Sequence, residues 1–187
     1  FVLPTDPRGR RDTLLAVLQK ESPQPVGVAG LSLGGALAEV LTCLEPGFAF
    51  SAPFIAHMDL GALVADAPVL GAMREDLLRF GWTPRDFGAF TKRLGWDELR
   101  PRIPPERICL FAARDDHFFR ASVVRAMWRR WQKPRIHWYP ASHMGFLVHL
   151  PDAVGRLRSF VDGLELTAPS GRPRSQRAKP SRPRRRG

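Results

Sequence analysis

Ser32 lies between two glycines in the segment Gly30-Leu31-Ser32-Leu33-Gly34-Gly35, which matches the pattern Gly-x-Ser-x-Gly. The apolar run Val26–Ala29 before it indicates a short buried strand, and a helix is expected from about Leu33 to Leu44. A serine on a sharp turn between a strand and a helix is exposed at the carboxyl end of a sheet, where its hydroxyl can attack a substrate. The pattern and its place in the chain therefore predict a nucleophilic serine.

The turn around this serine constrains its neighbours. Only small residues at Gly30 and Gly34 are expected to avoid a clash across so sharp a turn. The Leu33 N–H lies at the positively polarised start of the helix, so we expect it to donate to an oxyanion that develops during the reaction. The alternative interpretation of the same residues is a glycine-rich packing turn or a phosphate-binding loop.

A free serine hydroxyl is a weak nucleophile near neutral pH, so it needs a base and an acid that orients the base. His143 is the candidate base, in a loop of small residues after an expected strand at Arg135–Tyr139. Asp115 and Asp116 directly follow an expected strand at Arg107–Ala112, and either carboxylate could accept the imidazole N–H. The order serine, acid, histidine, each after a strand, favours catalysis over a structural loop histidine.

The elements that must position these residues alternate between strands and helices. Phe48–Ala52 indicates a further strand, and the helix at about Leu33–Leu44 is expected to be buried on both sides because it carries few charges. Two later helix faces are marked by Val124, Met127, Trp128 and Trp131, and by Val154, Leu157, Val161 and Leu164. Nearly continuous apolar strands alternating with helices predict an α/β fold, with a mostly parallel sheet covered on both faces.

Residues 57–105 differ from the rest, because glycines and prolines break them into short amphipathic pieces. We expect several short helices outside the main sheet. Such an insert could form a lid that shapes acyl selectivity and excludes water from the site, or it could be ordinary helical packing.

At these residues the chain resembles the α/β-hydrolase superfamily of serine hydrolases, over about residues 26–164. More narrowly, it resembles the branch that contains α/β-hydrolase domain-containing protein eighteen, whose Gly-Leu-Ser-Met-Gly-Gly turn differs from this segment only at Leu33. Four features of that branch align with this chain without a gap. They are its acid motif, its Val-Arg pair, its Trp and its small-small-His sequence, which align in that order with Asp116, Val124-Arg125, Trp131 and Ala141-Ser142-His143. This register selects Asp116 over Asp115. The family motif has Pro where Arg120 stands, so we expect the loop that carries the acid to be shaped differently here.

The resemblance implies that Ser32 is the nucleophile, His143 the general base and then acid, and Asp116 its orienting partner. The implied reaction is attack on the carbonyl of a small acyl substrate, formation of a covalent acyl-enzyme and hydrolysis by water, with no cofactor. The family has several strands before the serine turn, and a loop after one of them supplies the second oxyanion donor. Because so few residues precede Val26, we expect the first strands to lie upstream of Phe1. A chain without them could carry the whole triad and still be nearly inactive.

Most of the net charge of +11 on this chain of 187 residues lies at one end. Residues 168–187 hold eight basic residues, four prolines and no acidic residue, which leaves 21 basic against 18 acidic residues for residues 1–167. We expect residues 1–167, in a chain that is 44% apolar, to form one hydrolase domain, and residues 168–187 to be a disordered basic tail. The tail could bind a polyanion weakly and without sequence preference; a solvated extension is the alternative.

Few residues suggest other chemistry. Cys43 and Cys109 stand in apolar stretches and are expected to be buried thiols, which favours a reducing compartment such as the cytoplasm. His57, His137 and His149 lack metal-ligand spacing, so no metal site is expected. The longest nearly uncharged apolar run is far shorter than the roughly 20 residues of a membrane-spanning helix.

Two functions are therefore weighed. The first is a serine hydrolase that cleaves a carboxylic ester or related acyl bond through Ser32, Asp116 and His143, with Leu33 as an oxyanion donor. The second is a non-catalytic scaffold or inactive fragment of α/β-hydrolase type whose basic tail binds a polyanion.

Overall fold

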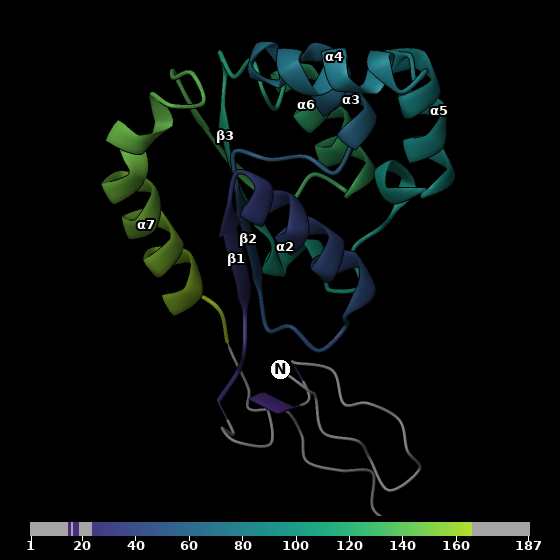
Figure 1. Ribbon diagram of the computed structural model, residues 1–187. Helices are drawn as coiled ribbons and strands as arrows, with labels where there is room; N and C mark the ends of the chain where they lie inside the picture. The colour runs from purple at the N-terminus through teal and green to yellow at the C-terminus, as the bar shows by residue number, and fades with distance from the viewer. Residues whose placement is uncertain (1–14, 16, 19–23, 166–187) are drawn as a thin grey trace, which may run out of the picture.

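A computed structural model describes residues 15, 17–18 and 24–165, and its centre is a four-stranded parallel sheet (Figure 1). The strands follow one another in space as in sequence: β1 (Val28–Leu31), β2 (Ser51–Phe54), β3 (Cys109–Ala113) and β4 (Arg135–Tyr139). Every residue of β2 and β3 is buried, because helices cover both faces of these central strands. The expected α/β fold with a parallel sheet is confirmed.

Three of the described helices lie against the sheet. Figure 1 shows α2 (Leu33–Leu44) and α6 (Ala121–Arg130) on one face and α7 (Phe146–Asp162) on the other. None of the helices that the structure describes has the length and apolar character of a transmembrane span.

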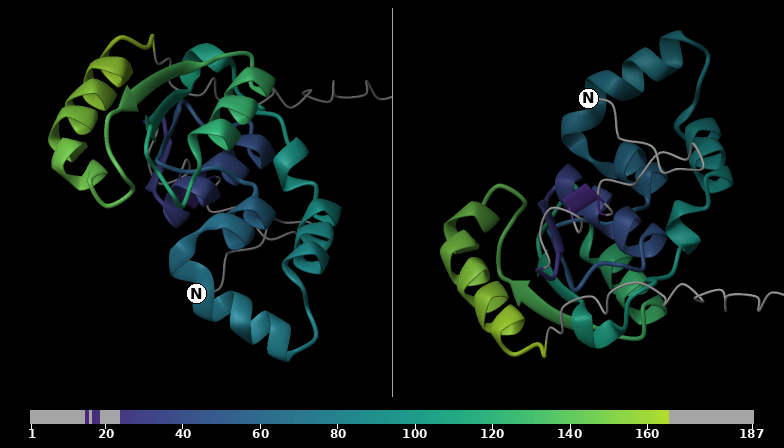
Figure 2. Two further views of the ribbon diagram at one scale, coloured as in Figure 1. Left: turned by 90° about the horizontal axis from the view of Figure 1, so that it is seen from above. Right: turned by 90° about the horizontal axis from the view of Figure 1, so that it is seen from below.

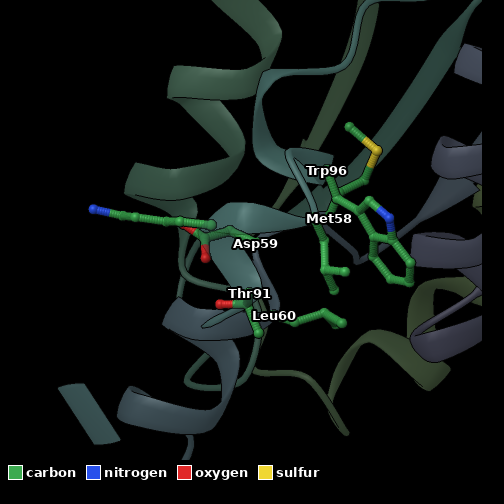
Figure 3. Close-up of a pocket in the computed structure, with 7 residues that line it drawn as sticks. Met58, Asp59, Leu60, Thr91 and Trp96 are labelled. Carbon is green, nitrogen blue, oxygen red and sulfur yellow. The ribbon is translucent and has the colours of Figure 1, made fainter. Parts of the chain in front are cut away.

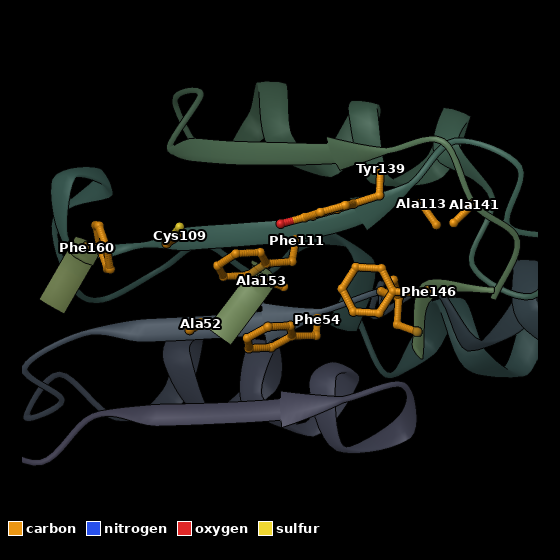
Figure 4. Packing of buried hydrophobic residues seen from close by; sticks show 11 residues of the cluster. Ala52, Phe54, Cys109, Phe111, Ala113, Tyr139, Ala141, Phe146, Ala153 and Phe160 are labelled. Carbon is orange, nitrogen blue, oxygen red and sulfur yellow. The ribbon is translucent and has the colours of Figure 1, made fainter. Parts of the chain in front are cut away.

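Each face of the sheet has its own core. Under α7, Phe54 and Phe111 stack with ring centroids 4.3 Å apart and Phe146 meets Phe54 edge to face, as Figure 4 shows. Under α2 and α6, the buried cluster includes Leu110 and Trp131. Alternate residues of β3 therefore supply the two cores, as the period of a strand requires.

The expected insert of short helices lies between β2 and β3, beyond the carboxyl ends of the strands (Figures 1 and 2). It comprises α3 (Leu60–Asp66), η1 (Pro68–Leu70), α4 (Gly71–Arg79), α5 (Pro84–Arg93), η2 (Trp96–Glu98) and η3 (Pro105–Arg107). The Arg74 guanidinium holds the end of α3 by donating to the carbonyls of Val64 and Ala67.

A cavity at the base of the insert is lined by Met58, Asp59, Leu60, Thr91 and Trp96, among others (Figure 3). Its volume is about 10 Å³, which leaves room for little more than one water molecule. This cavity is therefore too small to be a substrate pocket.

Strand boundaries differ from the predicted ones. The strands expected at Val26–Ala29, Phe48–Ala52 and Arg107–Ala112 each begin two or three residues later, whereas Arg135–Tyr139 is β4 as predicted. The Ala49 N–H donates to the Val26 carbonyl before the regular ladder starts. Apolar residues continue through such a lead-in, so hydrophobicity alone does not locate the first residue of the ladder.

The prediction that α2 is buried on both sides is wrong for the described part of the chain. Its buried face consists mostly of small residues, Gly35, Ala36, Ala38, Thr42 and Cys43, together with Glu39. Large exposed residues occupy the other face, Leu33, Leu37, Leu41 and Leu44. Small side chains allow the helix to approach the sheet closely, and the leucines consequently point away from it. Within the described residues β1 pairs only with β2, so β1 is an edge strand of the described sheet.

The apolar stripes predicted on the later helices are mostly buried. Val124, Met127 and Trp131 are buried around α6, and Leu157, Val161 and Leu164 pack against the core under α7. Val154 departs from the prediction, since it is exposed.

Glu39 is a buried carboxyl on α2, with an exposed fraction of 1%. Its Oε2 atom has no hydrogen-bond partner among the described residues. Burial raises the pKa of Glu39 well above its usual range, because removal from water penalises the charged form.

We expect Glu39 to make the stability of the fold depend on pH. The folded chain binds this proton more tightly than the unfolded chain. The free energy of unfolding therefore falls as the pH rises above about 4.3, the usual pKa of a glutamate, toward the raised pKa of the folded state. Glu39→Gln should flatten this decline. Urea unfolding of both proteins between pH 5 and pH 8 measures it, with Glu75→Gln as the control for loss of one exposed carboxylate. Equal slopes for wild type and Glu39→Gln would contradict the assignment.

Candidate active site

Ser32 lies on a strained turn between β1 and α2. Its φ of 57° and ψ of −120° are rare for a residue with a side chain. The Ser32 N–H donates to the Phe54 carbonyl (3.0 Å), and the Ser32 carbonyl accepts from the Ala36 N–H (3.0 Å). These bonds to β2 and to the first turn of α2 hold the serine in a conformation it would not adopt alone.

Gly30 is needed at this turn, as predicted. A Cβ atom on Gly30 would overlap the carbonyl of Gly34, where the chain crosses back over the end of β1. The prediction for Gly34 is wrong, because a Cβ there would meet no described atom within 4 Å apart from its chain neighbours and the backbone of its own helix. Gly35 is the second constrained position, since its Cβ would lie 2.7 Å from the Phe54 carbonyl oxygen. After the serine, the position where only glycine fits is therefore Gly35 and not Gly34, the glycine of the Gly-x-Ser-x-Gly pattern.

The loops after β3 and β4 carry Asp116 and His143. These loops are tied together where the Arg114 N–H donates to the Tyr139 carbonyl (2.9 Å) and the Asp115 N–H to the Ala141 carbonyl (3.1 Å). Figure 4 shows Ala113 and Ala141 side by side at this end of the sheet. Parallel pairing of β3 with β4 therefore brings both side chains to the edge where Ser32 lies.

The structure brings the three predicted side chains into one hydrogen-bonded chain. The Ser32 Oγ atom lies 2.9 Å from His143 Nε2, and His143 Nδ1 lies 2.8 Å from Asp116 Oδ2. The side chains of Asp116 and His143 are 1% and 10% exposed. Since a carboxylate only accepts, His143 Nδ1 donates to Asp116 and Nε2 is left to accept the serine proton. Asp115 is exposed and takes no part in this chain.

The second oxygen of Asp116 is also occupied. Asp116 Oδ1 accepts the backbone N–H groups of Phe118 (2.8 Å) and Phe119 (2.9 Å). Sequence reasoning did not assign these two phenylalanines a role. The feature of the sequence that could have indicated a role is that these two aromatic residues stand just after Asp116.

Leu33 is the first residue of α2. The N–H groups in the first turn of a helix have no partner within the helix, so the Leu33 N–H can donate to an anion beside Ser32. The arrangement as a whole can withdraw a proton from Ser32 Oγ and place a donor next to a charge that develops there.

The other candidate ligands stay apart. Among the residues that the structure describes, no group of three or more histidine, cysteine or acidic residues could hold a metal ion. Cys43 and Cys109 are buried free thiols, as expected, and burial raises the pKa of each to about 12. His57 is buried, and burial, with help from Arg156 and Arg135, lowers the pKa of His137.

Comparison with known proteins gives relatives of unassigned function. No family model matches the chain. The uncharacterized proteins MT2702 and Rv2627c of two Mycobacterium tuberculosis strains are each 30% identical to it over 174 residues. The match covers 89% of this chain but 39% of each relative, so the chain spans well under half the length of these curated proteins.

Solved structures show the fold. Pyrococcus furiosus esterase Pf2001 matches 79% of this chain and 58% of its own, with a TM-score of 0.53 and 16% identity. Pyrococcus horikoshii acylaminoacyl peptidase matches 78% of this chain and 25% of its own, with a TM-score of 0.56 and 13% identity. With the parallel sheet described above, these likenesses show that the chain has an α/β-hydrolase fold.

The two pattern glycines should respond differently to the same substitution. We expect Gly30→Ala to lower the free energy of unfolding by about 2 kcal/mol or more, because the new methyl group collides with backbone rather than with a movable side chain. Gly34→Ala, the matched control, should change it by no more than about 1 kcal/mol, in the stabilising direction, since alanine favours a helix. Urea unfolding of both variants tests this. Equal stability of the two would show that the turn around Ser32 is not built as described.

Proposed function

We propose that the protein is a serine hydrolase that cleaves a carboxylic ester or related acyl bond with Ser32 as nucleophile, His143 as base and Asp116 as orienting acid. One observation carries the proposal. Side chains from three separate loops meet at the carboxyl edge of the sheet in one hydrogen-bonded chain, with a serine at its outer end. Such a chain has the arrangement of a nucleophile, a base and an orienting group.

The first half of the reaction transfers an acyl group to the protein. His143 Nε2 removes the proton from Ser32 Oγ as that oxygen attacks the acyl carbonyl, and the imidazolium that forms is stabilised by Asp116. The negative charge on the carbonyl oxygen is met by the Leu33 N–H at the start of α2. His143 then gives its proton to the leaving group, and an ester between Ser32 and the acyl group remains.

The second half restores the serine. A water molecule loses a proton to His143 Nε2 and attacks the acyl-enzyme carbonyl, again with the Leu33 N–H donating to the oxyanion. The tetrahedral intermediate collapses, the Ser32 oxygen takes the proton back from His143, and a carboxylic acid leaves. The pair of Asp116 and His143 thus serves both halves without a cofactor.

Residues around the site favour an apolar acyl group. Leu33 follows the serine and is 61% exposed, and Met144 follows the histidine and is 65% exposed. Large apolar side chains next to both reacting residues favour contact with hydrocarbon over a charged group. An esterase and an acylaminoacyl peptidase among the similar structures support acyl chemistry in general terms.

Three finer parts of the proposal go beyond what the described residues show. The narrower resemblance to the branch of α/β-hydrolase domain-containing protein eighteen stays a prediction, and it supports the choice of Asp116. The domain limits of 1–167 and 168–187 also stay a proposal. The basic tail and its polyanion contact lie outside the described residues.

Labelling with a fluorophosphonate tests the nucleophile. We expect the full-length protein to be labelled and Ser32→Ala to abolish labelling, because the probe reacts only with an activated serine. Ser142→Ala is the control, since this exposed serine adjoins the base but is not bonded to it. Absence of label on a folded wild-type protein would refute the proposed function.

The neighbouring aspartates give a matched pair for testing the acid. Asp116→Asn should lower kcat for a p-nitrophenyl ester by about 10³-fold or more, because the amide favours the wrong imidazole tautomer. Asp115→Asn should stay within about twofold of wild type, since exposed sites away from the chemistry are tolerant. The reverse order of effects would show that the wrong aspartate has been assigned.

A further inference from the structure

We infer that Phe118 is a positioning residue for His143, whose ring fixes the plane of the imidazole and stabilises it when it is charged. The inference rests on the proposed function, because it concerns the base of that same site. It adds a residue to the machinery that neither the serine pattern nor the triad includes.

The contact between the two rings is close and nearly parallel. The ring centroids of Phe118 and His143 lie 4.5 Å apart, with an angle of 26° between the ring planes. Phe119 approaches the same imidazole at 5.5 Å with an angle of 34°. Two consecutive residues therefore contact the base through their side chains.

The same two residues also hold the acid through their backbone. Both N–H groups donate to Asp116 Oδ1, while Asp116 Oδ2 accepts from His143. The hydrogen bond from Nδ1 to Asp116 fixes one direction of the imidazole but leaves rotation about that direction open. A ring stacked on the face of the imidazole opposes this rotation and so keeps Nε2 aimed at Ser32.

The two phenylalanines differ in what else they contact. Phe119 is buried with Ala36 and Ala56 and meets the His57 ring edge to face at 5.0 Å, so it anchors the loop to the core. Phe118 is half-buried and packs against this cluster together with Leu63 of α3. Substitution of Phe118 therefore tests the ring contact with the least damage to the core.

A stacked aromatic ring also acts on the charge of the imidazole. When His143 takes the proton of Ser32, the positive ring faces the electron-rich face of Phe118, an attraction that a leucine cannot supply. This attraction grows only as the proton moves, so its loss should slow the chemical step rather than weaken substrate binding.

Steady-state kinetics on the full-length protein separate these effects. We expect Phe118→Leu, which keeps an apolar side chain but removes the aromatic face, to lower kcat for a p-nitrophenyl ester about tenfold, or about 1.4 kcal/mol, with KM changed less than about twofold. Phe118→Tyr, which keeps the face, should retain kcat within about twofold. Phe80→Leu is the matched control, because Phe80 is 83% exposed on the insert and touches neither reacting group.

Each outcome decides the inference. An unchanged kcat in Phe118→Leu, or equal losses in the Leu and Tyr variants, overturns it, since the aromatic face would then be irrelevant. A loss confined to KM would assign Phe118 to substrate binding and also overturn it. Thermal unfolding of each variant ensures that kcat is compared at a temperature where all are folded.

A second measurement does not need activity. In histidine-labelled protein the His143 ring protons should be shifted upfield by the stacked Phe118 ring, and the shift should disappear in Phe118→Leu and persist in Phe118→Tyr and Phe80→Leu. A wild-type protein that shows this shift but hydrolyses no ester refutes the proposed function and leaves the ring contact established. An active protein without the shift refutes the positioning role alone.

Discussion

The candidate site depends on parallel pairing of the four strands, because that pairing sends every strand's carboxyl end to the same edge. Ser32 follows β1, Asp116 follows β3 and His143 follows β4, so three loops far apart in sequence converge. An antiparallel neighbour would direct its loop to the opposite edge. Backbone hydrogen bonds then join the loop after β3 to the loop after β4. These bonds hold the two loops close enough for their side chains to form hydrogen bonds.

Much of this arrangement could be predicted from the sequence, because its signals are local. The strand at Arg135–Tyr139, the helix at Leu33–Leu44 and the broken insert follow from periodicity and from glycine and proline positions. The serine turn has a short pattern with a steric cause, which the crowding at Gly30 bears out. The choice of Asp116 over Asp115 needed the register of a resemblance, since both follow the same strand.

The features that were mispredicted or missed depend on contacts between distant residues. Whether a leucine of α2 is buried depends on what lies against that face of the helix. The small number of charged residues in the helix does not show which of its faces are covered. The crowding at Gly35 of α2 arises from the carbonyl of Phe54, a residue of strand β2. The stacking of Phe118 on His143 joins two loops that only the folded sheet brings together.

Two buried carboxyls show how the fold treats polar groups differently according to place. Asp116 accepts three hydrogen bonds, two from backbone amides and one from His143, so both of its oxygens are occupied in the folded state. Glu39 is also buried, but one of its oxygens has no partner among the described residues, and burial raises its pKa. Donors that belong to the backbone cannot rotate away during a reaction. The fold has thus fixed its polar donors around the carboxyl that bonds His143, an arrangement that suits the proposed catalysis, and not around the carboxyl in the core.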